Sequence, residues 1–281
     1  MRWLVVGSAG MLGRDLMALL GERGHEVVGV DRDEVDITDA ASTAGCAEDF
    51  DVVANVAAYT AVDRAESDEA AAFAVNAVGP ANLARAAAAA GARIVQISTD
   101  YVFDGLDERP YAEDAPIAPR SAYGRTKAAG EWAVRAEAPD HLVVRTAWLY
   151  GAHGACFPRT IARVAAEKGS VEVITDQVGQ PTWTVDLADL VERLVSAKAP
   201  SGTYHGTASG RASWFEFAQA AVAAAGLDPQ VVRRTTSADF VRPAPRPAFS
   251  VLGHDGLTRA GVTPIGAWDD AWRRAAADVL G

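Results

Sequence analysis

The 281-residue sequence has few cysteines, no long apolar run and no excess of positive charge. Its two cysteines, Cys46 and Cys156, have the spacing of neither a metal site nor a disulfide framework, so we interpret each as a free thiol. No apolar run reaches the ~18 residues of a membrane span. Residues 1–7 are too short and too soon interrupted by glycine for a signal peptide, and we therefore expect a cytoplasmic protein without a membrane partner.

The net charge of −11 argues against nucleic acid as a partner, because a nucleic-acid-binding surface is usually basic. An anionic small ligand is compatible with this charge, since backbone amides and a few arginines can hold it locally. A hydrophobic content of 49% and the length of the chain indicate a globular protein with a sizeable core.

A strand-like run, a glycine turn and a helical pattern follow one another at the N-terminus. Residues 3–6 are apolar, Gly7, Gly10 and Gly13 come next, and leucines at helical spacing continue to Gly24. This order is typical of dinucleotide binding, because glycines let the backbone approach a pyrophosphate and the helix N-terminus binds its charge. The spacing Gly-x-x-Gly-x-x-Gly is not the commoner Gly-x-Gly-x-x-Gly, so the turn alone is weak evidence.

Asp31 ends a second predicted strand at residues 26–30. A carboxylate about 20 residues past the glycines binds the adenosine ribose hydroxyls, which favours NAD. Arg32 follows, and it either accepts the 2′-phosphate of NADP or is a solvated loop charge. Asp36 and Ile37 either border the adenine or belong to an ordinary helix cap. The choice between NADPH and NADH is open.

Strands and helices alternate up to about residue 150. Further strands are predicted at 51–56, 93–97 and 141–146, and this alternation favours an α/β fold with a doubly wound parallel sheet of Rossmann type. Residues 1–150 would form the NAD(P)-binding domain. Residues 151–281 would form a smaller, mainly substrate-binding part that is interleaved with the first.

The stretch Ser121–Lys127 opens a predicted helix and places a phenol and an ammonium four residues apart. On a helix, Tyr123 and Lys127 lie one above the other on the same face. A nearby ammonium favours the phenolate and lowers the tyrosine pKa, which suits acid–base chemistry at a carbonyl. Solvated helix faces often show the same spacing, so the pair needs support from elsewhere in the chain.

Small and polar residues follow the predicted strands. A hydroxyl at Thr99 can bond a substrate carbonyl oxygen near Tyr123, or it can merely cap the next turn. Small residues around Ala58 let a flat ring approach the sheet edge, where ligands of such sheets bind. Trp148 either stacks on a ring ligand or packs in the core.

Together these features occur in the order of the extended short-chain dehydrogenase/reductase superfamily, and the sequence resembles its dTDP-4-dehydrorhamnose reductase family. The resemblance covers nearly the whole chain. Its most specific part is Ser98-Thr-Asp-Tyr-Val-Phe-Asp-Gly105, which is joined by the stretches Asn55–Glu66, Tyr123–Glu131, Arg145–Gly151, Asp176–Thr182 and Arg246–Leu252.

The resemblance implies an NADPH- or NADH-dependent reduction of the C4 ketone of dTDP-4-dehydro-6-deoxy-L-mannose (dTDP-4-dehydrorhamnose) to dTDP-L-rhamnose. Tyr123 would donate the proton, Lys127 would lower its pKa and hold the nicotinamide ribose, and Thr99 would bond the carbonyl oxygen. The implied cofactor contacts are Gly7, Gly10, Met11, Leu12, Gly13, Asp31, Arg32, Asp36, Ile37, Ala58, Tyr59, Thr60, Tyr123 and Lys127. The implied contacts to the dTDP-linked 4-keto-6-deoxysugar are Val62, Thr99, Asp100, Tyr101, Trp148, Gln180 and Arg246.

Some features depart from the family pattern or leave alternatives open. Tyr59 and Cys156 stand where relatives have His and Asn, respectively. No metal ligand is assigned, so the use of Mg²⁺ and the choice between monomer and homodimer are open. Tyr101 follows Asp100 at the position where a 4,6-dehydratase needs Glu, so the base for that reaction is missing. The remaining alternatives are a ketoreductase or epimerase for another nucleotide-linked deoxysugar, and a non-catalytic dinucleotide-sensing regulatory subunit.

Overall fold

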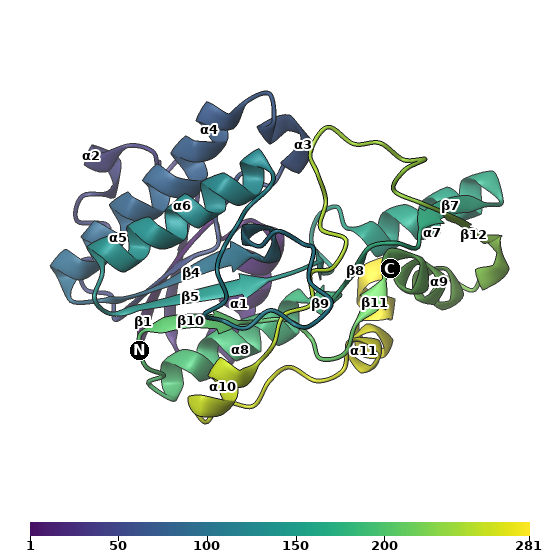
Figure 1. Ribbon diagram of the computed structural model, residues 1–281. Helices are drawn as coiled ribbons and strands as arrows, with labels where there is room; N and C mark the ends of the chain where they lie inside the picture. Colours follow the sequence, from purple (N-terminus) through teal and green to yellow (C-terminus); the bar gives the residue numbers. More distant parts are fainter.

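The computed structural model describes all 281 residues and has a six-stranded parallel sheet at its centre (Figure 1). The strand order is β10-β5-β4-β3-β1-β2, and it reverses between β3 and β1, where ligands of open α/β sheets bind. The strands are β1 (Arg2–Val6), β2 (Glu26–Val30), β3 (Val52–Asn55), β4 (Arg93–Thr99), β5 (His141–Thr146) and β10 (Gly202–His205).

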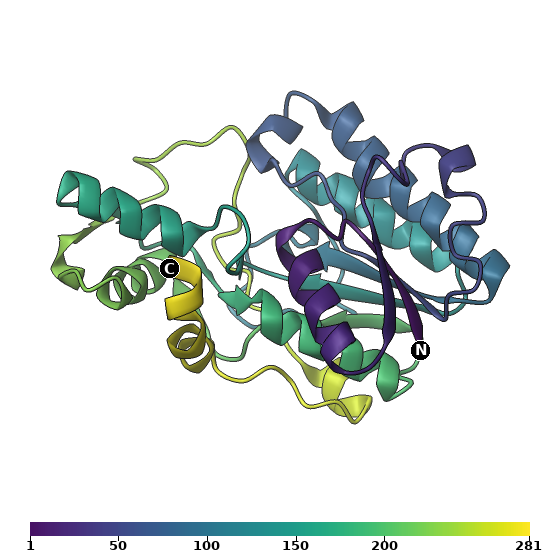
Figure 2. The same cartoon turned by 180° about the vertical axis from the view of Figure 1, so that it is seen from behind.

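Helices cover both faces of this sheet (Figures 1 and 2). On one face, α5 (Gly79–Ala90) and α6 (Ala122–Glu137) bury an apolar cluster with Leu4 and Val6 of β1. On the other face, α1 (Met11–Glu22) and α8 (Thr184–Ser196) bury a second cluster with Trp3 and Val5. Alternate residues of a doubly covered strand face opposite layers, so β1 is apolar throughout. The predicted doubly wound Rossmann-type fold is confirmed.

The chain after β5 forms a second part beside the sheet, built from short strand pairs and three long helices (Figure 1). An aromatic cluster that includes Tyr150, Phe217 and Trp272 forms its core. The strand pairs are β6 (Leu149–Tyr150) with β9 (Thr182–Trp183), β8 (Val178–Gly179) with β11 (Ala212–Ser213), and β7 (Val171–Ile174) with β12 (Val232–Thr235). The long helices are α7 (Phe157–Lys168), α9 (Trp214–Ala224) and α11 (Trp268–Leu280).

Two elements beyond residue 150, α8 and β10, pack with the first 150 residues. We therefore keep the division at residue 150 as a proposal in its interleaved form. None of the helices is long and apolar enough to cross a lipid bilayer. The remaining short elements are α2 (Ala40–Thr43), α3 (Val62–Ala65), α4 (Glu69–Phe73), η1 (Ala74–Val78), η2 (Asp100–Val102), η3 (Pro229–Val231) and α10 (Asp255–Arg259).

Between α4 and α5 the chain passes through η1, a single π-helical turn. The side chain of Asn76 in this turn binds the backbone N–H and C=O of Tyr59, at 2.8 and 3.1 Å, and the hydroxyl of Thr126 at 3.1 Å. Its backbone carbonyl lies against Gly130 of α6. The π turn thus joins the loop after β3 to the helix that carries Tyr123, and such turns often occur near functional sites.

We predict that Gly130→Ala destabilises the protein by roughly 1–3 kcal/mol, because the added methyl group would overlap the carbonyl oxygen of Asn76. Gly21→Ala is the matched control: it lies in α1, and its added carbon meets nothing within 4 Å. This control should be neutral or stabilising by up to about 1 kcal/mol. Urea unfolding of both variants checks the prediction, and equal midpoints would contradict it.

Candidate active site

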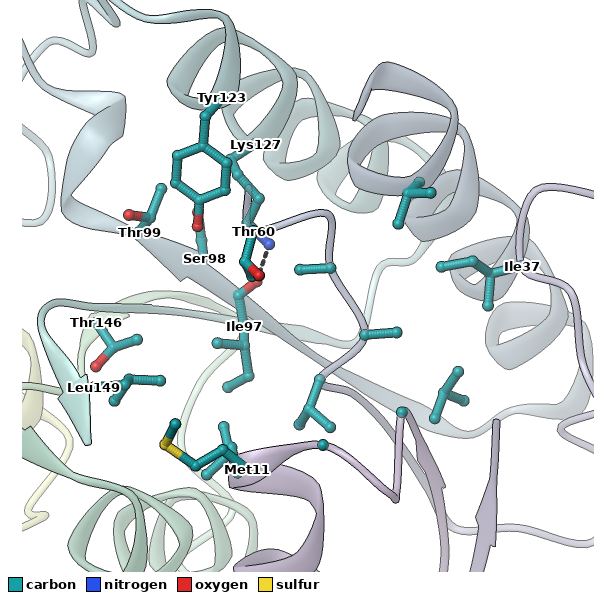
Figure 3. A pocket seen from close by; sticks show the side chains of 18 of the residues that line it. Met11, Ile37, Thr60, Ile97, Ser98, Thr99, Tyr123, Lys127, Thr146 and Leu149 are labelled. Carbon is teal, nitrogen blue, oxygen red and sulfur yellow. Dashed lines mark hydrogen bonds between the residues drawn. The ribbon is translucent and has the colours of Figure 1, made fainter. Parts of the chain in front are cut away.

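A cavity of about 650 Å³ opens at the carboxyl ends of the central strands (Figure 3). Its wall takes residues from the segment after each of five neighbouring strands, including Gly7 after β1, Asp31 after β2 and Ala58 after β3. Thr99 and Thr146 line it at the ends of β4 and β5. The parallel sheet thus brings together residues that are far apart in the sequence.

Most residues predicted for the site line this cavity. They are Gly7, Gly10, Met11, Leu12, Asp31, Arg32, Asp36, Ile37, Ala58, Thr60, Val62, Thr99, Asp100, Tyr101, Tyr123, Lys127 and Trp148. Figure 3 shows Tyr123 and Lys127 pointing into the cavity from α6, with Thr99 beside the phenol and Ile37 at the far end. The cavity is therefore long, with the predicted catalytic residues grouped in one part of it.

Gly13 and Tyr59 do not line the cavity. A side chain at Gly13 would overlap the carbonyl oxygen of Gly7, so this glycine lets α1 begin directly against the glycine turn. The backbone of Tyr59 is held by Asn76, and its hydroxyl is buried without a hydrogen-bond partner in the protein. Both residues shape the loops around the cavity in this structure.

Gln180 and Arg246, the predicted nucleotide contacts, also lie outside the lining. The amide of Gln180 donates to the carbonyl of Leu252 (3.2 Å) and accepts from its N–H (2.8 Å), so Gln180 holds the C-terminal segment. The expected substrate contact of Gln180 is therefore not seen, because both ends of the amide are already bound within the protein. Arg246 forms an ion pair with Asp63, next to the cavity-lining Val62.

Tyr123 lies in the first turn of α6, whose start is fixed by Ser121. The Ser121 hydroxyl accepts a hydrogen bond from the N–H of Gly124 at 3.1 Å. The rings of Tyr101 and Tyr123 pack edge to face, with their centres 5.5 Å apart. Burial raises the pKa of Tyr123 to about 12, although a hydrogen bond with Thr99 opposes the shift. The phenol therefore keeps its proton at neutral pH.

Lys127 is buried one helical turn after Tyr123. Its ammonium donates a hydrogen bond to the carbonyl oxygen of Ile97, with an Nζ–O distance of 2.6 Å. Burial lowers the pKa of Lys127 to about 8, against the opposing charge of Glu131. The expected lowering of the Tyr123 pKa by Lys127 stays a prediction; in this structure burial of the phenol dominates and the net shift is upward.

Two buried oxygens in the cavity wall have no hydrogen-bond partner in the protein. They are Oδ2 of Asp100 and Oγ1 of Thr146. The Thr99 hydroxyl donates to Oδ1 of Asp100 at 2.9 Å and accepts from the N–H of Tyr101 at 3.2 Å. Buried polar atoms are normally paired, so these oxygens are a local cost to stability, which the Ser250 hydroxyl next to Asp100 reduces.

The glycine turn fits a dinucleotide. Gly7 has a φ of +90°, which favours glycine, and Gly10 precedes α1 without a side-chain cap. The backbone N–H groups of the first turn of α1 therefore have no side-chain partner at the cavity end of the helix. Binding of a pyrophosphate requires such free donors. Asp31 binds the turn itself, because it accepts from the Ser8 hydroxyl (2.8 Å) and the Ala9 N–H (3.0 Å).

The chain matches the family model described as "RmlD substrate binding domain" over residues 1–280. A dTDP-4-dehydrorhamnose reductase from Streptomyces griseus is 48% identical over 95% of this chain and 90% of its own length. This chain belongs to the dTDP-4-dehydrorhamnose reductase family. It is thus an NAD(P)H-dependent oxidoreductase, as predicted, and the reading as a non-catalytic regulatory subunit is set aside.

Two further relatives bear on cofactor and substrate. The crystal structure of dTDP-4-dehydrorhamnose reductase from Bacillus anthracis, in complex with NADP, superposes with a TM-score of 0.95, at 33% identity over 99% of each chain. A probable dTDP-4,6-dihydroxy-2-methyloxan-3-one 4-ketoreductase from Streptomyces antibioticus is 48% identical over 100% of this chain and 96% of its own length.

Several lining residues were not among the predicted site residues. Thr146 and Leu149 follow β5 closely, and the strand-end rule that indicated Thr99 would also have indicated them. Val75 comes from the π turn, for which the sequence carries no clear signal. The other lining residues outside the prediction are Val6, Val35, Thr38, Val56, Ala57, Ile97, Ser98 and Ala147.

We predict that Asp100→Asn stabilises the protein at neutral pH. Burial raises the pKa of Asp100 from 3.8 to about 6, so the native state binds this proton more tightly than the unfolded chain does. The wild type therefore loses stability relative to the variant as the pH rises from about 4 to 6. The total loss is roughly 2–3 kcal/mol, and above this range the difference in stability stays constant.

Chemical unfolding at several pH values checks this prediction. Asp63→Asn is the matched control with the opposite sign, because the hydrogen bond from Arg246 lowers the pKa of Asp63. The wild type should gain stability over that control as the pH rises through the acid range. A difference between wild type and Asp100→Asn that does not change with pH would contradict the prediction.

Proposed function

We propose that this protein reduces the C4 ketone of dTDP-4-dehydro-6-deoxy-L-mannose to dTDP-L-rhamnose, with Tyr123 as the proton donor. The observation that carries the proposal is the convergence of Tyr123, Lys127 and Thr99 on one part of a cavity that also contains the glycine turn. Membership of the dTDP-4-dehydrorhamnose reductase family supports the same reaction.

In this proposal Tyr123 is the general acid of the reaction. NAD(P)H, when bound, supplies the hydride that reduces C4. As the carbonyl oxygen becomes an alkoxide, the phenol gives it a proton, so that a secondary alcohol is formed. A pKa raised to about 12 supports this role, because Tyr123 then holds its proton until the oxyanion develops.

Thr99 and Lys127 would hold the reacting groups in place. The Thr99 hydroxyl donates to Asp100 in this structure, and the substrate carbonyl would replace that carboxylate as its acceptor. The ammonium of Lys127 uses one N–H for Ile97, which leaves two donors for ribose hydroxyls.

We further propose that NADPH is preferred over NADH. The carboxylate of Asp31 already binds Ser8 and Ala9 of the glycine turn, so it is less available to the ribose hydroxyls. Arg32 lines the cavity, and 83% of its side chain is exposed, so its guanidinium is accessible to a 2′-phosphate. The Bacillus anthracis relative crystallised with NADP is in line with this choice.

A second candidate substrate is another dTDP-linked 4-keto-deoxysugar. The 4-ketoreductase from Streptomyces antibioticus and the dTDP-4-dehydrorhamnose reductase from Streptomyces griseus are both 48% identical to this chain. Identity over the whole chain therefore does not separate the two substrates. The choice depends on the shape of the cavity wall around the sugar.

Product analysis by NMR tests the proposed function. The protein is incubated with the dTDP-4-keto sugar and either NADPH or NADH, while nicotinamide absorbance at 340 nm is followed. We expect dTDP-L-rhamnose and faster turnover with NADPH. Turnover only of a different dTDP-linked ketosugar would favour the second candidate, and no oxidation of either cofactor with any of these sugars would overturn the proposal.

We predict that Tyr123→Phe lowers kcat by at least about 100-fold, because it removes the proton donor. Its dissociation constant for NADPH, measured by fluorescence titration, should change little. Tyr111→Phe is the matched control, since that hydroxyl donates to Asp104 at 2.6 Å outside the cavity. Near wild-type turnover in the Tyr123 variant would remove Tyr123 from the mechanism.

A further inference from the structure

A buried polar cluster lies between α6 and the sheet, directly beside Thr99. Ser98 of β4, Arg145 of β5 and His205 of β10 are paired in register across three neighbouring strands, and all three are buried. Glu131 of α6 lies over this row and is completely buried. A row of polar side chains is unusual beneath a helix, because this layer of a doubly wound sheet is normally apolar.

Glu131 accepts four hydrogen bonds, three from the row and one from Arg135 of the same helix. It accepts from Ser98 Oγ (2.6 Å), from Arg145 Nε and Nη2 (2.9 and 2.8 Å), and from Arg135 Nη2 (2.8 Å). Burial by itself would raise the pKa of Glu131, but the hydrogen bonds and charge of Arg145 hold it below its usual value. The side chain is therefore a carboxylate at neutral pH.

A second connection lies one helical turn earlier. Lys127 of α6 donates to the carbonyl of Ile97, and Ile97 directly precedes Ser98 in β4. Two consecutive residues of β4 are thus bound by two α6 residues that are four positions apart. Thr99 is the next residue of β4, and Tyr123 lies one turn before Lys127. These two connections fix the distance between the phenol and the Thr99 hydroxyl.

Three cationic side chains surround the single carboxylate of Glu131. Arg135 and Arg145 are both paired with it, and Lys127 lies one turn away on the same helix. His205 is neutral, because burial and the charge of Arg145 lower its pKa to about 3. Glu131 is the carboxylate whose charge acts on the buried ammonium of Lys127.

We propose that Glu131 is a positioning residue for the reduction: through Ser98 it sets Thr99 against Tyr123, and through its charge it keeps the Lys127 ammonium in place. This inference rests on the proposed function. An ion pair that only stabilised the fold would need Arg145 and Glu131 but not Ser98. The donor of the Ser98–Glu131 hydrogen bond directly precedes Thr99, and that hydrogen bond is the connection to test.

Ser98→Ala removes this hydrogen bond without leaving a buried charge unpaired. The matched control is Ser196→Ala on α8, where the serine hydroxyl also donates to an Arg-paired carboxylate, Glu192, at 2.5 Å. We expect kcat of Ser98→Ala to fall at least about tenfold, because small displacements of reacting groups are costly. KM for the sugar nucleotide and Kd for NADPH should change less than about twofold, since the only group removed from the cavity wall is a hydroxyl already bound to Glu131.

Ser98→Thr keeps the hydroxyl and should retain most of kcat, and Ser196→Ala should leave kcat unchanged. The inference is overturned if Ser98→Ala turns over like the wild type. It is also overturned if Ser98→Ala and Ser196→Ala lose activity equally, or if the loss follows the melting temperature of each variant, since these outcomes indicate a general structural role.

A measurement without turnover separates this inference from the proposed function. The chain has three lysines, Lys127, Lys168 and Lys198, so protein labelled with ¹³C at lysine Cε gives three signals. Loss of the Glu131 charge in Glu131→Gln should lower the titration midpoint of Lys127 by at least about half a pH unit, with Lys168 and Lys198 unchanged. An unchanged Lys127 midpoint overturns the electrostatic part of the inference. Should the Gln variant not fold, Ser98→Ala decides.

Discussion

The hydrogen bond between the Lys127 ammonium and the Ile97 carbonyl joins the helix of the phenol to the strand of the threonine. Its Nζ–O distance is 2.6 Å, and both groups are buried, so it holds in a region from which water is excluded. Together with the hydrogen bond between Glu131 and Ser98, it ties α6 to two consecutive residues of β4. The same burial raises the pKa of the phenol and lowers that of the ammonium, and both groups hold their protons at neutral pH.

The site is assembled at a cost to stability. Asp100 is buried with one oxygen unpartnered, and the hydroxyl oxygen of Thr146 is also buried without a partner. A fold under selection for stability alone would place apolar residues there. Large apolar clusters on both faces of the sheet offset this cost, and they leave the carboxyl edge free to carry polar groups aimed at a ligand.

Local patterns in the sequence predicted much of this arrangement. The ranges of β2 and β5 agree with the predicted ones, because strand periodicity is a local property. Thr99 and Tyr123 could be placed together because parallel strands end at one edge. The pairing of Gln180 with Leu252, 72 residues away, depends on how distant segments pack. The pKa of Tyr123 depends on burial. The spacing of residues in the sequence indicates neither that pairing nor this burial.

Selectivity among related sugars depends on a part of the wall that spacing does not describe. Trp148 has a φ of +48°, which is uncommon for a residue with a side chain, and its ring stacks on Trp214 of α9 at 3.5 Å. Gly179 leaves room for the same ring, since a methyl group there would lie 2.5 Å from it. The strained backbone and the stack fix the indole from the second part of the chain. The residues proposed for catalysis come from the first part, so in the proposed function chemistry and choice of sugar can vary independently.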